Sequence, residues 1–173
     1  MTSGDLRALI DTTAAAHGLD PAIVLALVQV ESSGNPWAWN PEHRYRYFWD
    51  VARNRPFRAI SALELANQFP PPDFNGLAGD DDNEWWGQQA SWGLTQIMGA
   101  VARELGFTGH YLTALCDPAV NLTYGCMKLK AELTWTYGDV RAALACYNGG
   151  RAGNAPSGPL RNAGYAARVL ART

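Results

Sequence analysis

The chain has 173 residues, enough for one domain with a sizeable hydrophobic core and too few for two domains of ordinary size. Hydrophobic residues make up 47% and charged residues 17%, a composition that excludes intrinsic disorder as the main state. The formal net charge is −2, so we expect no nucleic-acid partner and no general attraction to acidic membranes.

Two helices are predicted at the start of the chain. The first carries an apolar stripe and stops at 17–18, His-Gly. The second begins at Asp20-Pro21, which is a typical cap followed by a first-turn proline, and the Ser-Gly-Asn-Pro stretch at 33–36 closes it. This second helix contains the longest apolar run, 22–30, which is too short to span a bilayer, so no membrane insertion is expected.

The middle of the chain is rich in aromatic residues. Residues 37–49 contain six of them, and the spacing of Ser61 and Glu64 is that of a capping box before a short helix. Three prolines at 70–72 break the chain, and we expect the acidic run at 80–84 to be a solvated loop.

The remainder of the chain again has helical spacing. A helix over 94–105 would end at Gly106, and Asp117-Pro118 would start a long helix that stops at Gly138. Two further helices are predicted over 140–147, capped by Asp139, and from about residue 160. Because no stretch alternates with period two, few or no strands are expected, and the predicted fold is mainly α, in a single domain over 1–173.

No cofactor or metal site is indicated. The three cysteines show no ligand spacing, and the histidines His17, His43 and His110 are scattered. We interpret the cysteines as small buried residues, with a Cys116–Cys126 bridge as the less favoured alternative; the third cysteine is Cys146.

Glu31 is the first candidate for catalysis. It ends the apolar second helix, and Val24, Leu27 and Val28 share its face. Apolar neighbours and the negative end of the helix dipole both disfavour the charged form of a carboxyl group, so both would raise its pKa. A raised pKa is what a general acid needs near neutral pH. Taken alone, the residue also fits a surface glutamate that turns out to water.

Four segments, in order, resemble the soluble lytic transglycosylase family. Residues 23–36, Ile-Val-Leu-Ala-Leu-Val-Gln-Val-Glu-Ser-Ser-Gly-Asn-Pro, are similar to its first motif. Residues 91–98, Ser-Trp-Gly-Leu-Thr-Gln-Ile-Met, resemble the second, and 143–150, Ala-Leu-Ala-Cys-Tyr-Asn-Gly-Gly, the third. The fourth is the last helix, where Tyr165 stands at the position of a family tyrosine. The resemblance covers most of the chain outside 37–90.

The resemblance implies a lysozyme-like α-helical domain that binds glycan strands of peptidoglycan. It implies that Glu31 is the single general acid and base, which cleaves the β-1,4 bond between N-acetylmuramic acid (MurNAc) and N-acetylglucosamine (GlcNAc) and yields 1,6-anhydro-MurNAc. It also implies that several other residues lie near substrate: Ser32, Gln96, Tyr147, Asn148 and Tyr165, with weaker candidates in Ser91 and Trp92. A monomer is expected.

Each of these residues also has a structural interpretation. Gln96 fits an exposed helix position, Asn148 fits a helix-ending asparagine, and Tyr147 and Tyr165 fit core packing. In the functional interpretation Tyr147 hydrogen-bonds Glu31 and holds its orientation, and the hydroxyl of Tyr165 lies near Glu31. Two residues depart from the second motif, because Thr95 stands where methionine is usual and Gly99 where proline is common.

The stretch 37–90 is interpreted as an insertion between the first and second motifs. For Trp37, Trp39 and Trp49 a local hydrophobic cluster is the preferred interpretation. For Trp85, Trp86 and Trp92, a local hydrophobic cluster and platforms for sugar rings are equally favoured interpretations. Glu84 is the first candidate for a second carboxylate, which would make the protein an inverting hydrolase like goose-type lysozymes.

Two wider expectations complete the prediction. A third interpretation, from another class of function, is a glycan-binding or virion module without catalysis. The first residues do not resemble a signal peptide. A wall-degrading domain of this kind is therefore expected to act at the bacterial cell wall or periplasm, either as a bacteriophage or prophage endolysin released by a holin-type pore, or in a virion.

Overall fold

The computed structural model describes residues 2–67, 69–77 and 79–173. It divides into two compact units, the first formed by 1–34 with 125–173 and the second by 35–124. The boundary in the second half of the chain falls within one helix, α6 (Pro118–Trp135). The prediction of one domain over 1–173 stays a prediction, and the two units are described one after the other.

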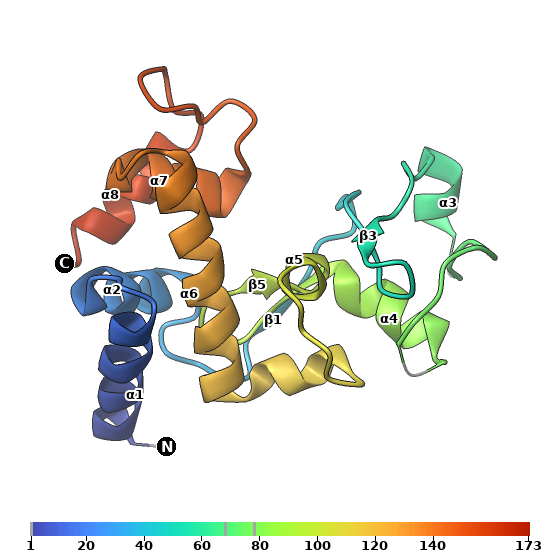
Figure 1. The fold of residues 1–173 in the computed structure, drawn as a ribbon, viewed down its shortest axis with the longest axis horizontal. Helices are drawn as coiled ribbons and strands as arrows, with labels where there is room; N and C mark the ends of the chain where they lie inside the picture. The colour runs from blue at the N-terminus through green and yellow to red at the C-terminus, as the bar shows by residue number, and fades with distance from the viewer. Residues whose placement is uncertain (1, 68, 78) are drawn as a thin grey trace. The chain divides into compact units, whose positions relative to one another are not determined.

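The regular elements of the first unit, within its described residues, are all helices. It consists of α1 (Ser3–Ala16), α2 (Pro21–Glu31), the later part of α6, α7 (Val140–Gly149) and α8 (Ala163–Leu170). Helix α8 contacts both α2 and α7, and α1 packs on α2 (Figure 1). The predicted starts are confirmed for α2 and α7, where the side chains of Asp20 and Asp139 accept hydrogen bonds from the backbone N–H groups of Ala22 and Ala142.

The second unit combines short helices with short strands. Its elements are β1 (Trp39–Pro41), β2 (Trp49–Asp50), β3 (Arg55–Pro56), α3 (Ala62–Ala66), α4 (Asp81–Gln88), β4 (Ala90–Trp92), β5 (Ile97–Met98), α5 (Gly99–Glu104), the 3-10 helix η1 (Leu112–Cys116) and the first turns of α6. Strands β1, β4 and β5 form an antiparallel sheet in that order, with Trp39 opposite Trp92, and β2 pairs with β3.

Two predicted elements of this unit were wrong in extent or type. The helix expected over 94–105 begins only at Gly99, because residues 93–96 form a turn and Ile97–Met98 a strand. Since this whole stretch is largely buried, its apolar spacing does not separate a helix from a strand and turn. The acidic run is not a loop, because Asp80 caps α4 and its acidic residues stand in the first turn, where the helix dipole favours them.

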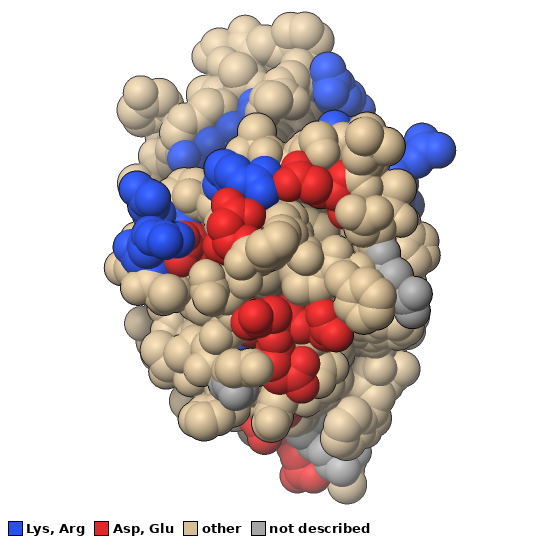
Figure 2. Space-filling model, turned by 90° about the vertical axis from the view of Figure 1, so that its right-hand side faces the viewer, with Lys and Arg blue, Asp and Glu red and all other residues tan. Residues whose placement is uncertain are grey.

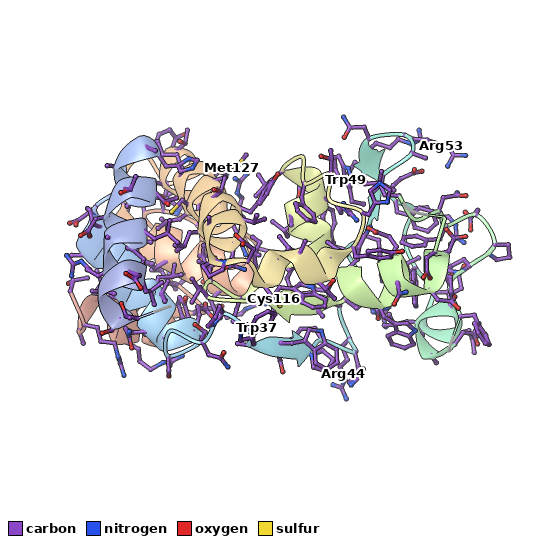
Figure 3. All side chains as sticks on the ribbon, turned by 90° about the horizontal axis from the view of Figure 1, so that it is seen from below. Trp37, Arg44, Trp49, Arg53, Cys116 and Met127 are labelled. Carbon is purple, nitrogen blue, oxygen red and sulfur yellow. The ribbon has the colours of Figure 1, made fainter. Side chains whose placement is uncertain are left out.

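Two apolar clusters form the core of the second unit. One joins Phe48, Ile60, Phe74 and Trp85, and its centre is a stack of Phe48 on Trp85 with ring centroids 4.2 Å apart. The other surrounds β4, α5 and η1. The expected cluster of Trp37, Trp39 and Trp49 is wrong, because Trp37 is 75% and Trp39 55% exposed, and Trp49 is only partly buried. Trp37 and Trp49 lie apart from each other in Figure 3.

The surface carries charges of both signs in small patches, some of them adjacent, on the face shown in Figure 2. Arg58 pairs with both Glu64 and Asp73 in the second unit. No helix among the described residues is long and apolar enough to cross a membrane. The three cysteines are buried and free, so the alternative of a Cys116–Cys126 bridge is wrong.

Candidate active site

Glu31 is the last residue of α2, and its carboxyl group meets α8. The hydroxyl of Tyr165 donates a hydrogen bond to Glu31 Oε1. Tyr165 is itself buried, on the face of α8 that packs against the rest of the first unit. The backbone N–H and the hydroxyl of Ser32 both donate to the carbonyl of Val28, which closes the end of α2 directly after the glutamate. The hydroxyl of Ser32 therefore helps to end the helix.

Burial decides the protonation of Glu31. Loss of hydration raises the pKa of this carboxyl group, and three weaker influences oppose the rise: the hydrogen bond from Tyr165 and the positive charges of Lys128 and Arg168. The net shift is upward, as the apolar face of α2 predicted. A carboxyl group of this kind keeps its proton to a higher pH than an exposed glutamate, which is the state a general acid needs.

Lys128 and Arg168 are functional candidates that sequence reasoning missed. The ammonium group of Lys128 lies 4.4 Å from the ring centroid of Tyr147 and donates to the Tyr147 carbonyl oxygen. Arg168 lies over the ring of Tyr165, 5.7 Å from its centroid. The spacing of Tyr165 and Arg168, three residues apart on one helix, was a usable signal for the second of these.

The residues of the third motif have structural roles as well. Tyr147 is buried, with Lys128 over its ring. The hydrogen bond to Glu31 described above comes from Tyr165, and the one expected from Tyr147 stays a prediction. Asn148 lies within α7 and is exposed, and its side-chain oxygen accepts from Asn162 Nδ2 at 2.8 Å. The interpretation of Asn148 as the helix-ending residue is wrong, because α7 continues to Gly149 and the positive φ of 73° at its end belongs to Gly150.

The second motif forms the turn between β4 and β5, in the second unit. Gln96 has a φ of 48°, and its Nε2 donates to the carbonyl oxygens of Ala38 and Gly93. Its Oε1 accepts from the hydroxyl of Ser91 at 2.8 Å. The exposed helix position considered for Gln96 is therefore wrong. The side chain thus stabilises the turn through both its donor and its acceptor atoms.

Asn121 of α6 fixes this turn. Its Oδ1 accepts from both the N–H and the hydroxyl of Thr95, each at 2.8 Å, and its Nδ2 donates to the carbonyl oxygen of Trp92. Thr95, a departure from the resembled motif, thus has a structural role. The second departure is explained by close packing, because a Cβ atom at Gly99 would overlap the carbonyl oxygen of Gly87.

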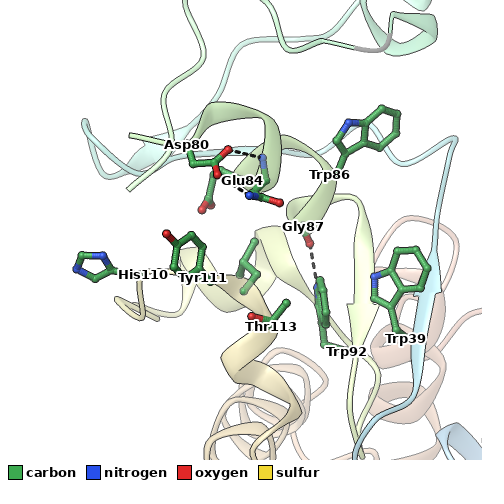
Figure 4. A pocket seen from close by; sticks show the side chains of 11 residues that line it. Trp39, Asp80, Glu84, Trp86, Gly87, Trp92, His110, Tyr111 and Thr113 are labelled. Carbon is green, nitrogen blue, oxygen red and sulfur yellow. Dashed lines mark hydrogen bonds between the residues drawn. The ribbon is translucent and has the colours of Figure 1, made fainter. Parts of the chain in front are cut away.

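The tryptophans of the insertion divide into buried and accessible ones. Trp85 is fully buried against Phe48, so its interpretation as a sugar platform is wrong. Trp92 is 8% exposed, and its indole N–H donates to the carbonyl oxygen of Gly87 at 2.9 Å. Trp86 is 40% exposed, and with Trp92 it lines a pocket in the second unit (Figure 4).

Glu84 does not fit the role of a second catalytic carboxylate. It is 4% exposed, and its two oxygens accept from Arg103 Nε at 2.8 Å and from Nη2 at 2.7 Å. Gln88 donates a further hydrogen bond to Glu84 Oε1. A carboxylate held on three sides in this way is a structural ion pair. The sequence showed only that Glu84 stands near the second motif, and the pairing with Arg103 explains its place.

The described residues contain no group of three or more His, Cys, Asp and Glu side chains arranged to hold a metal ion. In the first unit, the ionisable groups that act on Glu31 are Tyr165, Lys128 and Arg168.

Comparisons with known proteins point to one family. The model of the Transglycosylase SLT domain family matches residues 8–158. A transglycosylase of Enterobacteria phage PRD1 is 29% identical over 141 residues, which cover 82% of this chain and 33% of that protein. The chain thus spans about a third of the length of this relative.

A solved structure shares the fold. The X-ray structure of an inactive mutant of lytic transglycosylase Slt from Pseudomonas aeruginosa matches with a TM-score of 0.59 and 17% sequence identity. The match covers 96% of this chain and 23% of that one. It confirms the mainly α, lysozyme-like fold that the sequence predicted.

Proposed function

The chain belongs to the Transglycosylase SLT domain family, and from this membership we propose that it is a peptidoglycan lytic transglycosylase. Its substrate in this proposal is the glycan strand, and the bond cleaved is the β-1,4 linkage between MurNAc and GlcNAc. The observation that carries the proposal is the buried Glu31, whose raised pKa keeps a transferable proton and whose position is held by Tyr165.

In the proposed reaction Glu31 acts twice. It first donates its proton to the glycosidic oxygen, so that the C1–O bond of MurNAc breaks and GlcNAc leaves with a hydroxyl group. The resulting carboxylate then accepts the proton of the MurNAc C6 hydroxyl, whose oxygen bonds to C1 and closes a 1,6-anhydro ring. The glutamate ends in its starting state, no water is consumed, and one carboxyl group is sufficient.

The products of purified peptidoglycan test this mechanism. Mass spectrometry should find fragments that end in 1,6-anhydro-MurNAc and are lighter than hydrolysis products by one water molecule. Reducing-end products would instead establish a muramidase with a second carboxylate. Release of nothing by folded protein, across several wall types, would favour a glycan-binding module.

Glu31→Gln tests the role of the glutamate. The amide preserves the shape of the side chain but has no acidic proton, so the cleavage rate should fall by about 10²- to 10⁴-fold. The matched control is Glu132→Gln, which changes a buried carboxylate, paired with Arg151, outside the proposed chemistry. Its folded fraction should retain cleavage, and wild-type rates in Glu31→Gln would reject Glu31 as the acid.

We also propose that the chain acts at the bacterial cell wall in a bacteriophage or prophage context. The similarity to a transglycosylase of phage PRD1 supports this proposal. Cleavage of intact host walls by purified protein added from outside, compared with expression inside the cell with and without a pore-forming protein, would test it.

A further inference from the structure

The second unit contains a pocket that the proposed reaction does not use. It has a volume of about 410 Å³, within the range of about 300–1,000 Å³ that small-molecule sites occupy. We call it the aromatic pocket, because four of its lining side chains are Trp39, Trp86, Trp92 and Tyr111 (Figure 4). They come from β1, α4, β4 and the residue before η1, so the insertion and the chain that follows it both contribute.

Large aromatic faces remain in water around this pocket. Trp39 is 55%, Trp86 40% and Tyr111 53% exposed, although each has apolar surface that folding normally buries. Trp39 lies beside Trp92, with ring centroids 6.2 Å apart and planes tilted by 51°, so two indoles form adjoining walls. Several exposed aromatic rings around one hollow indicate a ligand with flat apolar faces.

The polar groups of the pocket are neutral or acidic. Asp80, Asn83, His110 and Thr113 contribute hydrogen-bonding side chains to its lining, and no lysine or arginine is among the lining residues that the structure describes. Glu84 also borders the pocket, but its charge is paired with Arg103. Such a lining disfavours phosphates and carboxylates, and it suits a ligand with several hydroxyl groups.

Arg103 holds two walls of the pocket together. It binds Glu84 of α4 on one side, and its Nη1 donates to the carbonyl oxygens of Phe107 and Gly109 on the other, each at 2.8 Å. Gly109 immediately precedes His110 and Tyr111 in the chain. The buried ion pair thus fixes the spacing between the wall of Trp86 and the wall of Tyr111 before any ligand arrives, which lowers the entropy lost on binding.

We propose that the aromatic pocket binds an N-acetylated hexopyranose ring of the glycan strand, through residues of the second unit alone. The two faces of the pyranose stack on Trp86 and Trp39, its hydroxyl groups reach Asp80 and His110, and the acetamido methyl group contacts Leu112. This inference rests on the proposed function, since it takes the glycan strand as substrate. It assigns to the insertion a part in binding the glycan strand.

The test is a titration of the Glu31→Gln protein with tri-N-acetylchitotriose, a glycan without peptide stems. The indole N–H signals of ¹⁵N-labelled tryptophan report the result, and each is assigned by a Trp→Phe variant. The signals of Trp39 and Trp86 should shift and saturate. Trp86→Ala should weaken binding by about tenfold, as expected for loss of one stacked face, and Trp86→Phe should restore most of it.

Trp37→Ala is the matched control, because Trp37 is exposed in the same unit but does not line the pocket. It should bind the trisaccharide as the parent does. Equal affinity in Trp86→Ala would overturn the proposal, as would signals of Trp39 and Trp86 that respond only to a stem peptide. Wild-type protein that releases anhydro products while these signals stay unchanged would refute the pocket alone, and absence of products would refute the proposed reaction.

Discussion

The contact between Glu31 and Tyr165 joins two segments that lie 134 residues apart in the chain. Two opposing effects meet at this carboxyl group. Burial favours the protonated form, and the hydroxyl of Tyr165 stabilises the charged form by donating to it. Both states of the glutamate are used in the proposed reaction, first as acid and then as base, so neither may be stabilised too strongly over the other.

Tyr165→Phe should therefore change the pH dependence of cleavage. Removal of the donated hydrogen bond raises the pKa of Glu31 further, so the limb of kcat/KM that falls with rising pH should move to higher pH. The rate at the optimum should fall by up to about 100-fold, because the carboxyl group loses its orientation. Rates measured across pH on soluble glycan fragments would show this, and a limb that moves to lower pH would contradict it.

Burial of Glu31 also predicts a conflict between stability and activity. Its pKa is higher in the folded than in the unfolded chain, so its contribution to the free energy of unfolding is fully present below the unfolded pKa. It is lost as pH rises through the folded value. Glu31→Gln cannot ionise and should be more stable than wild type at pH 8, with the difference vanishing towards pH 4. Urea unfolding at both pH values checks this, and a less stable variant at pH 8 would argue against it.

Neighbouring residues show where sequence reasoning failed at this scale. Trp85 and Trp86 are adjacent, and the sequence predicts the role of a sugar platform equally for both. Successive residues of a helix, however, point about 100° apart. One therefore enters the core on Phe48 and the other borders the pocket. Glu84 was chosen for its closeness to the second motif, whereas its partner Arg103 lies 19 residues away. Pairing of this kind comes from packing and leaves no local pattern.

At the scale of elements, caps were predictable and short strands were not. The capping box of Ser61 and Glu64 and the caps at Asp20 and Asp139 are formed by neighbours in the sequence, so the local pattern contains them. Strands of two or three residues are too short to show period two. The hairpin of β4 and β5 instead depends on Asn121, which reaches it from α6.

Asn121→Ala should destabilise the protein severely. The side chain is fully buried, and its loss takes the acceptor from Thr95 and the donor from the carbonyl oxygens of Trp92 and Leu115. Each buried polar group affected costs about 1–3 kcal/mol, so the free energy of unfolding should fall by roughly 3 kcal/mol or more. Urea unfolding measures it.

Thr123→Ala, on the same helix, is the control for this measurement. Its hydroxyl bonds only within the helix, to the Ala119 carbonyl, and surface changes of this type usually stay within about 0.5 kcal/mol. If both variants unfold at the same urea concentration, Asn121 does not hold the hairpin.

At the scale of the whole molecule, the continuity of α6 decides how the two units unfold. Its first turns belong to the second unit and its remainder to the first, in one helix of 18 residues. Unfolding of either unit removes part of that helix, and helices are cooperative along their length. We therefore expect the two units to unfold together, in accord with the prediction of a single domain.

The three cysteines can report this transition, because Cys116 lies in the second unit and Cys126 and Cys146 lie in the first. Burial raises the pKa of all three thiols, that of Cys126 to about 12, so thiol reagents at pH 8 should label none of them in the folded chain. In increasing urea, single-cysteine variants, with the other two cysteines replaced by alanine, should become reactive at one common midpoint. Labelling of Cys116 at a clearly different urea concentration from Cys126 and Cys146 would show two domains that unfold independently.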